Sequence, residues 1–318
     1  MGTMKDFIDE WRSPRPYIEA HTSGSTGQPK DILLLKSDMR VSALNTIRFF
    51  GLNENSVVAI PLSASYIAGK MMAVRAELCG GRLLELPVSN RIELVEPVDL
   101  ISVVPSQLES LLQLDRELVR GILIGGAPMS TRQEEAVMAS GIPAWIGYGM
   151  TETCSHVALR RVGASPVYHA VGDVTFTADK YGCLVIHSQE FSWKTLITRD
   201  VVSIESPTSF MWLGRADNVI NSGGLKIHPE KLEEEIRLLL PGLQEFYIAS
   251  EPHAKWGQAV VMVIDETEYT SFQDLPERLE RGLSDSRHFP HRFLVTDKLP
   301  KTSNNKIIRK LPETYYEI

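Results

Sequence analysis

The stretch TSGSTGQPK at residues 22–30 decides how the rest of the chain is interpreted. Its hydroxyl side chains compete for backbone hydrogen bonds and its glycines lose much entropy when fixed, so it makes a poor helix and a poor strand. Taken alone, such a tract is typical of a flexible surface loop. Here it lies between two segments that are predicted to be ordered. Its backbone N–H groups, hydroxyls and lysine would suit the binding of a polyphosphate. The candidate phosphate-binding residues are Thr22, Ser23, Gly24, Ser25, Thr26, Gly27 and Lys30.

Composition narrows the class of protein. A length of 318 residues indicates about two domains, and the net charge of −7 argues against a binder of nucleic acid or anionic membranes. No apolar run is long enough to span a bilayer, and the start of the chain lacks the apolar core of a signal peptide. The three cysteines are widely spaced and form no metal or redox motif. We expect a cytoplasmic protein with no nucleic-acid or membrane partner, and its oligomeric state stays open.

Strand and helix signals alternate as far as residue 150. Buried strands are expected at 31–35, 56–62, 82–87, 100–105, 121–126 and 144–149, with helices between them. Ser106 with Glu109 and Ser130 with Gln133 have the spacing of a capping box, which marks a helix start. The alternation predicts an α/β fold with a mostly parallel, doubly wound sheet, whose ligands bind at the carboxyl ends of the strands.

The pattern changes after residue 160. Residues 160–212 read as a small antiparallel β-subdomain, and a linker leads to a helix at 228–240, with Pro229 at its start, and then to a small α+β unit. We therefore expect an N-terminal domain at residues 1–216 and a C-terminal domain at 217–318.

Five motifs in this chain resemble, in order, those of the acyl-adenylate-forming superfamily. That superfamily includes acyl-CoA ligases, peptide-synthetase adenylation domains and firefly luciferase. The motifs are TSGSTGQPK (22–30), GGAP (125–128), YGMTET (148–153), GRADNVINSGGLKIHPEKLEEEI (214–236) and LPKTSNNKIIRK (299–310). The resemblance implies two reactions: a carboxylate attacks the α-phosphorus of ATP to give an acyl-adenylate, and coenzyme A then displaces AMP. It also implies Mg²⁺. Both transition states spread negative charge over oxygens, so positioned donors and cations are needed.

The resemblance assigns roles within the N-terminal part. Residues 22–30 would hold the β- and γ-phosphates, and Tyr148 with Gly149 would flank the base. Thr151 would contact the α-phosphate and Glu152 would hold Mg²⁺. The adenine would lie along Gly125, Gly126 and Ala127.

Further roles follow for residues nearer the C-terminus. Asp200 would bind the ribose hydroxyls and Arg215 the ribose or a phosphate, while Asp217 would be the hinge about which the C-terminal domain rotates between the reactions. Lys306 would bridge the carboxylate and the α-phosphate as the catalytic lysine. Gly223 and Gly224 would line the tunnel for pantetheine. Two positions depart from the family pattern: Arg199 and Asn305 each stand where glycine is usual.

The acid substrate is the least specific part of this interpretation. Only about twenty residues precede the phosphate loop, whereas family members usually carry a whole further subdomain there. Short members of this kind resemble the o-succinylbenzoate–CoA ligases of menaquinone synthesis, and residues 61–87 resemble them in particular. Lys70 and Arg75 both offer a cation to a second substrate carboxylate. We favour Lys70, which follows Gly69 near the helix start, with Tyr66 beside the ring.

Two other functions remain open. The chain would suit another aryl- or fatty-acyl-CoA ligase or an adenylation domain that loads a carrier protein, although no basic docking patch is evident. A non-catalytic nucleotide-binding protein is disfavoured because Lys30, Glu152 and Lys306 are all present.

Overall fold

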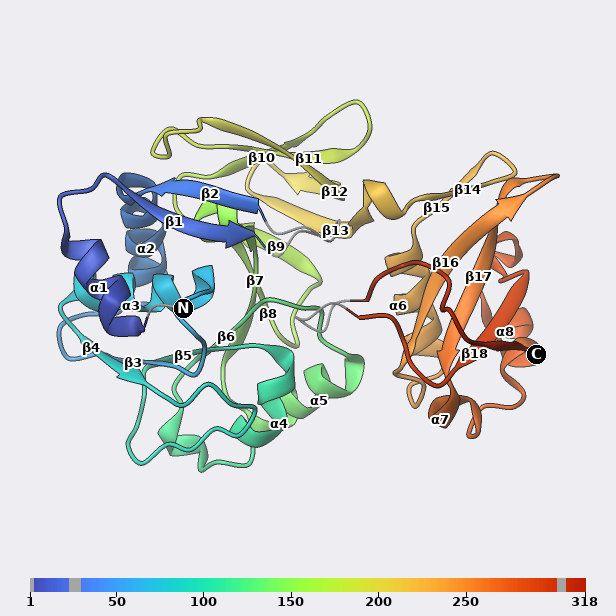
Figure 1. The fold of residues 1–318 in the computed structure, drawn as a ribbon, viewed down its shortest axis with the longest axis horizontal. Coiled ribbons are helices and arrows are strands. Elements are labelled where there is room, and N and C mark those ends of the chain that lie inside the picture. Colours follow the sequence, from blue (N-terminus) through green and yellow to red (C-terminus); the bar gives the residue numbers. More distant parts are fainter. Residues whose placement is uncertain (1–2, 23–29, 302–306) are drawn as a thin grey trace. The chain divides into compact units, whose positions relative to one another are not determined.

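The computed structural model describes residues 3–22, 30–301 and 307–318 (Figure 1). They form two compact units. The first comprises Met1–Thr177, Val185–Ile197 and Ile204–Met211, and the second Ala178–Leu184, Thr198–Ser203 and Trp212–Ile318. The predicted domain boundary at Asp217 falls inside the second unit. Within the described ranges, no helix combines the length and apolar character needed to cross a bilayer.

One large mixed sheet organises most of the described chain. Its order is β10-β11-β12-β13-β9-β8-β7-β6-β5-β3-β4, in which β4, β3, β5, β6 and β7 are parallel and β7, β8 and β9 antiparallel. The expected α/β class is confirmed, and the antiparallel strands continue the parallel sheet. The strands are β3 Val57–Ile60, β4 Arg82–Glu85, β5 Leu100–Val103, β6 Ile122–Ile124, β7 Ala144–Met150, β8 Ser155–Arg161, β9 Val167–Ala170, β10 Thr175–Ala178, β11 Cys183–His187, β12 Thr195–Ser206 and β13 Ser209–Arg215.

Helices pack on both faces of the parallel strands. Successive residues of β3 show why: Val58 and Ile60 pack into the core with α1, α2 and α3, and Ala59 packs into the core with α4 and α5. Such continuous apolar strands are typical of a sheet covered on two sides. Figure 1 shows α4 and α5 beside each other and apart from α1–α3. The helices are α1 Met4–Arg12, α2 Lys36–Phe50, α3 Ile67–Cys79, α4 Leu108–Leu111 and α5 Thr131–Ser140.

The segment DILLL is a strand, but not of the main sheet. It belongs to β2 (Lys30–Leu35), which pairs only with β1 (Tyr17–Thr22) in a two-stranded antiparallel ribbon. Leu34 is buried whereas Leu33 is 62% exposed, so the ribbon covers the core with one face.

The two predicted capping boxes had different outcomes. Ser130 and Gln133 form theirs at the start of α5. The Ser106 box is wrong, because Pro105–Gln107 form a 3-10 turn ahead of α4 and the Ser106 hydroxyl donates to Asn90. The side chain of Gln107 instead accepts from the backbone N–H of Val104.

The rest of the second unit is a six-stranded sheet with helices. The order is β15-β14-β17-β18-β19, with β16 also paired to β17. Helix α6 begins at Pro229, as expected, and buries Leu232 and Ile236 in the apolar core of this unit. The elements are β14 Ile220–Ser222, β15 Leu225–Ile227, α6 Pro229–Leu239, β16 Phe246–His253, β17 Gly257–Asp265, α7 Glu266–Tyr269, α8 Leu275–Gly282, β18 Arg292–Thr296 and β19 Tyr316–Glu317.

Candidate active site

The predicted phosphate loop joins the two strands of the β1–β2 ribbon. Thr22 pairs with Lys30 at the end of that ribbon, so residues 23–29 connect neighbouring strand ends. Ser23, Gly24, Ser25, Thr26 and Gly27 lie outside the described residues, and Thr22 and Lys30 are placed by backbone alone. Strand β1, which leads into the loop, contacts the turn Thr151–Thr153, which contains two other candidate residues.

The predicted adenine segment directly follows β6. A Cβ added to Gly125 would meet nothing within 4 Å, so this backbone is open to approach by a ligand. Gly126 has φ +86°, and a Cβ there would lie 3.1 Å from Cγ1 of Val104. A side chain at Gly126 is thus disfavoured by both backbone conformation and space. Ala127 continues the same loop at the carboxyl end of the strand.

The loop after β7 is fixed by a close backbone approach. A Cβ on Gly149 would lie 2.0 Å from the carbonyl oxygen of Ser155, so only glycine fits. Tyr148 is already packed against other aromatic rings, with centroids 5.0 Å from Phe210 and 5.9 Å from Tyr168. Its ring therefore has a fixed orientation at the strand end.

Thr151 and Glu152 lie in the 3-10 turn Thr151–Thr153 at the end of β7. The hydroxyl of Thr153 holds the turn by bonding the carbonyls of Met150 and Ser155 at 3.0 and 2.6 Å. Ser155 itself has φ 129°, an uncommon backbone conformation for a non-glycine residue. Glu152 is exposed. No cluster of three potential metal ligands occurs within the described ranges.

A buried arginine contacts Ser155, which follows this turn closely in the chain. Arg75 of α3 is 1% exposed, and its Nη2 donates to Oγ of Ser155 at 2.8 Å. In the described part of the chain, its other contact is Sδ of Met72, and Nε has no hydrogen-bond partner. Burial lowers the pKa of Arg75 to about 9. A buried guanidinium with so few acceptors is poorly compensated, and the sequence alone gave no sign of its burial.

His156 lies beside this arginine in the same interior. Its Nε2 is 3.0 Å from Oγ1 of Thr46, and the ring is 8% exposed. Burial, together with the charge of Arg75, holds the pKa of His156 well below its ordinary value of 6.5. The imidazole is therefore neutral in the folded protein at neutral pH.

Lys70, the predicted acid-binding cation, lies on another side of α3. Its Nζ is 4.7 Å from the ring centroid of Phe7 in α1, and burial lowers its pKa. Tyr66 caps the start of α3 and is 50% exposed. The backbone of Gly69 packs closely against that of Ser63, because a Cβ on Gly69 would lie 2.3 Å from the carbonyl oxygen of Ser63.

The second unit brings the predicted ribose residues together. Asp200 accepts from Nε1 of Trp212 at 3.2 Å and lies 3.5 Å from Nη1 of Arg215. The carboxylate of Asp217 lies 3.0 Å from Arg215 and 3.1 Å from Arg199. Arg199, noted in the sequence only as a departure, is thus an ion-pair partner of the predicted hinge residue.

The two predicted tunnel glycines adopt conformations that favour glycine. Gly223 has φ +59° and Gly224 φ +85°. The N–H of Gly223 donates to the carbonyl of Trp256 at 2.9 Å, and a Cβ on Gly224 would meet nothing within 4 Å. Gly224 therefore leaves open space next to its backbone.

Lys306 lies outside the described residues, as does Asn305. The residues on either side of 302–306 are described, and Lys301 pairs with Ile307 as an isolated bridge. Nζ of Lys301 also lies 2.6 Å from Oε2 of Glu245.

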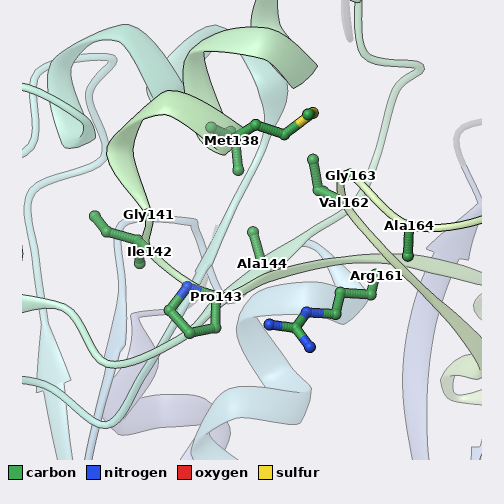
Figure 2. Close-up of a pocket in the computed structure, with 10 residues that line it drawn as sticks. Met138, Gly141, Ile142, Pro143, Ala144, Arg161, Val162, Gly163 and Ala164 are labelled. Atoms are coloured by element: carbon green, nitrogen blue, oxygen red, sulfur yellow. The ribbon is translucent and has the colours of Figure 1, made fainter.

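Two cavities of the first unit lie at the opposite, amino ends of the parallel strands. One, of about 350 Å³, is lined by Met138, Gly141, Pro143 and Arg161 among others, and Figure 2 shows the Arg161 side chain extending toward Pro143. The other, of about 450 Å³, lies before β5 and β6 and is lined by Phe49, Phe50 and Trp145. Of the predicted site residues that the structure describes, none lines either cavity.

Comparison with known proteins gave consistent matches. Residues 10–182 match a family model described as AMP-binding enzyme. The 2-succinylbenzoate–CoA ligase of Listeria monocytogenes is 26% identical over 98% of this chain and 72% of its own length. An acyl-CoA synthetase (AMP-forming)/AMP-acid ligase II-like protein from Dyadobacter fermentans is 32% identical, with a TM-score of 0.63 over 95% of this chain and 90% of that one. MenE, the O-succinylbenzoate coenzyme A synthetase of Bacillus subtilis, solved with ATP and a magnesium ion, has a TM-score of 0.78 and 22% identity over 92% of this chain and 68% of that one.

Proposed function

Because the chain belongs to the AMP-binding enzyme family, we propose that it is an AMP-forming acid–CoA ligase acting on o-succinylbenzoate. It would use ATP and Mg²⁺ to form o-succinylbenzoyl-adenylate, and coenzyme A would then displace AMP to give the thioester used in menaquinone synthesis. The ligases named among its relatives support this substrate.

One observation carries the proposal. Strand β1, which leads into the phosphate loop, contacts the turn Thr151–Thr153, and both lie in the first unit together with the backbone at Gly125. The loops after β6 and β7 leave adjacent parallel strands at their carboxyl ends, where ligands of such sheets bind.

In the first reaction, the chain's own groups stabilise charge. The hydroxyl of Thr151 would donate to an oxygen of the α-phosphate, and the exposed carboxylate of Glu152 would hold Mg²⁺. When bound, Mg²⁺ neutralises phosphate charge. Lys306 would approach the attacking carboxylate and the α-phosphate, where a lysine acts as a compact charge on a long stem.

The ribose of ATP would be held by residues of the second unit. The carboxylate of Asp200 accepts hydrogen bonds and suits the two ribose hydroxyls, and Arg215, whose Nη1 lies 3.5 Å from it, supplies a cation. For the second reaction, the turn at Asp217 would act as the hinge, and the open backbone at Gly223–Gly224 would admit pantetheine.

The second carboxylate of the acid needs a cation that holds it away from the α-phosphate. Lys70 stays a prediction, but its Nζ lies over Phe7. Arg75 fits better, because its guanidinium donates to Ser155, two residues after the turn Thr151–Thr153, and its Nε has no hydrogen-bond partner among the described residues. A carboxylate at Arg75 would compensate a buried charge, and such charge-assisted hydrogen bonds contribute about 1.5–3 kcal/mol.

The test is acid-dependent pyrophosphate release with ATP and Mg²⁺ over a panel of carboxylic acids, followed by thioester formation with CoA. The proposal predicts that o-succinylbenzoate is preferred at least tenfold over benzoylpropionate, which lacks the ring carboxylate. Equal activation of both acids would show that o-succinylbenzoate is not the specific substrate. Pyrophosphate release with neither acid would exclude this class of acid as substrates.

A further inference from the structure

Glu230, in the first turn of α6, joins two distant segments of the second unit. Its side chain is 12% exposed. Its Oε1 accepts a hydrogen bond from Nδ2 of Asn218 and lies 3.2 Å from Nε of Arg309. Asn218 ends the 3-10 turn Ala216–Asn218, and Arg309 belongs to the chain that follows residues 302–306. One carboxylate oxygen therefore connects the turn at Asp217 with the chain next to Lys306.

Arg309 has further partners besides Glu230. Its guanidinium pairs with both oxygens of Glu233, with Nη2 2.9 Å from Oε2, and Nη1 also donates to the carbonyl of Ile248 at 2.9 Å. Glu233 in turn accepts from the N–H of Ile248 at 2.7 Å. Glu230 therefore joins Asn218 to a cluster in which Arg309 is also held by Glu233 and the carbonyl of Ile248.

The other oxygen of Glu230 faces the opposite end of the same turn. Oε2 is buried and has no hydrogen-bond partner among the residues that the structure describes, and a Cβ added to Gly214 would lie 2.5 Å from it. Gly214 has φ +139°, so glycine is favoured there by conformation as well as by space. Glu230 thus contacts the chain just before Arg215 and just after Asp217. An acceptor left without a donor is costly, which indicates that this placement serves something other than stability.

We propose that Glu230 is a positioning residue that couples the turn Ala216–Asn218 to the chain around Arg309, and so orients the C-terminal part of the second unit relative to the hinge. This inference rests on the proposed function, in which Asp217 is the pivot and Lys306 serves adenylation. Asn218, Glu230 and Arg309 all lie on the C-terminal side of the pivot, so they move as one body. Gly214 lies on the other side, so a pivot at Asp217 changes the contact at Oε2.

The kinetic test separates positioning from folding. In Glu230→Ala we expect the kcat of acid-dependent pyrophosphate release to fall at least tenfold, with the KM values for ATP and acid changed less than twofold. Reaction of a supplied acyl-adenylate with CoA should change less than twofold. Glu230→Gln keeps an oxygen acceptor for Asn218 and Arg309 and should retain more than half of the rate. Equal losses in both half-reactions, or no rescue by glutamine, would overturn the proposal.

A double variant tests the link itself. Asn218→Ala should likewise lower the kcat of pyrophosphate release and leave the reaction with CoA nearly unchanged. Asn218→Ala combined with Glu230→Ala should lower that kcat no further than Glu230→Ala alone, because both substitutions remove the same interaction. Glu234→Ala is the matched control, since Glu234 lies on the same helix and is exposed. If the double variant loses rate by the product of the two single losses, or if Glu234→Ala loses tenfold, the Asn218–Glu230 interaction does not have the proposed role.

Hydrogen exchange provides a readout that does not need activity. In Glu230→Ala, amides of peptides covering 214–222 and 307–318 should both exchange faster than in Glu234→Ala, while those of α8 stay unchanged. Faster exchange in only one of the two peptides would overturn the coupling. If both respond in a protein that forms no adenylate with any acid, the coupling stands and the proposed function fails.

Discussion

The two edges of the parallel sheet differ in what they offer a ligand. The amino edge has both cavities, walled by aromatic and aliphatic side chains such as Phe49, Trp145 and Met138. The carboxyl edge has close backbone approaches at Gly149, an uncommon backbone conformation at Ser155 and a poorly compensated charge at Arg75. Strained backbone and buried, underpaired charge lower stability, and they cluster at functional sites. The comparison teaches that, for the proposed function, buried charge and close backbone approach favour the carboxyl edge as the candidate site, whereas cavity volume alone favours the amino edge.

The largest expected effect comes from Lys306. If it serves the first reaction alone, Lys306→Ala should slow acid-dependent pyrophosphate release at least a hundredfold, because a lost transition-state donor costs roughly 3 kcal/mol or more. A supplied acyl-adenylate should still react with CoA at the wild-type rate. Single-turnover assays of each half-reaction check this, and an equal fall in both would show that the assigned role is wrong.

A pair of glycines tests whether the carboxyl edge is built for close approach. Gly149→Ala forces a Cβ against the backbone of Ser155, and we expect it to lower the free energy of unfolding by about 2 kcal/mol. Gly125→Ala places its Cβ in open space, so the fold should be unaffected while the KM for ATP rises. Urea unfolding and ATP kinetics measure the two effects. If the Gly125→Ala variant keeps the wild-type affinity for ATP, the assignment of the adenine to this loop is wrong.

The two buried cations of α3 make a sharper comparison within the same region. Arg75→Met should raise the KM for o-succinylbenzoate more than tenfold, leave the KM for ATP nearly unchanged, and leave stability unchanged or higher, since it removes a poorly compensated buried charge. Lys70→Met, which keeps an unbranched side chain beside Phe7, should change the acid KM less than threefold. The reverse ranking of the two variants would return the acid-binding role to Lys70.

A smaller effect concerns pH. The unfolded state takes up a proton on His156 near pH 6.5, whereas the folded state does not until well below that value. The free energy of unfolding should therefore fall as the pH drops below about 6.5, by up to about 1.4 kcal/mol per pH unit from this group. His156→Gln, which can keep the bond to Thr46, should lose this component. Urea titrations from pH 7 to 5 measure it, and identical slopes in both proteins would refute the assignment.

Regular patterning made much of the fold predictable. The apolar segments at 56–62 and 121–126 are parallel strands, Pro229 begins α6, and Ser130 caps α5. The errors occurred where tertiary pairing outweighed local signals. DILLL pairs with β1 outside the main sheet, and Gln107 satisfies the backbone that Ser106 was expected to cap.

The site was predictable only in part. Motif order identified the loops after β6 and β7, because their glycines are needed for backbone reasons that sequence spacing reflects. The burial of Arg75, its contact with Ser155 and the ion pair of Arg199 with Asp217 depend on packing between segments far apart in the chain. No local pattern contains that information. The assignments of Ser23–Gly27 and Lys306 stay predictions, since these residues lie outside the described ranges.

The comparison of the two edges can be tested directly by hydrogen exchange with and without a non-hydrolysable ATP analogue and Mg²⁺. The carboxyl-edge account predicts protection of amides in peptides covering 125–128 and 148–155, with no change at 49–53 and 141–145. Protection of the amino-edge peptides, with none at the carboxyl edge, would contradict it.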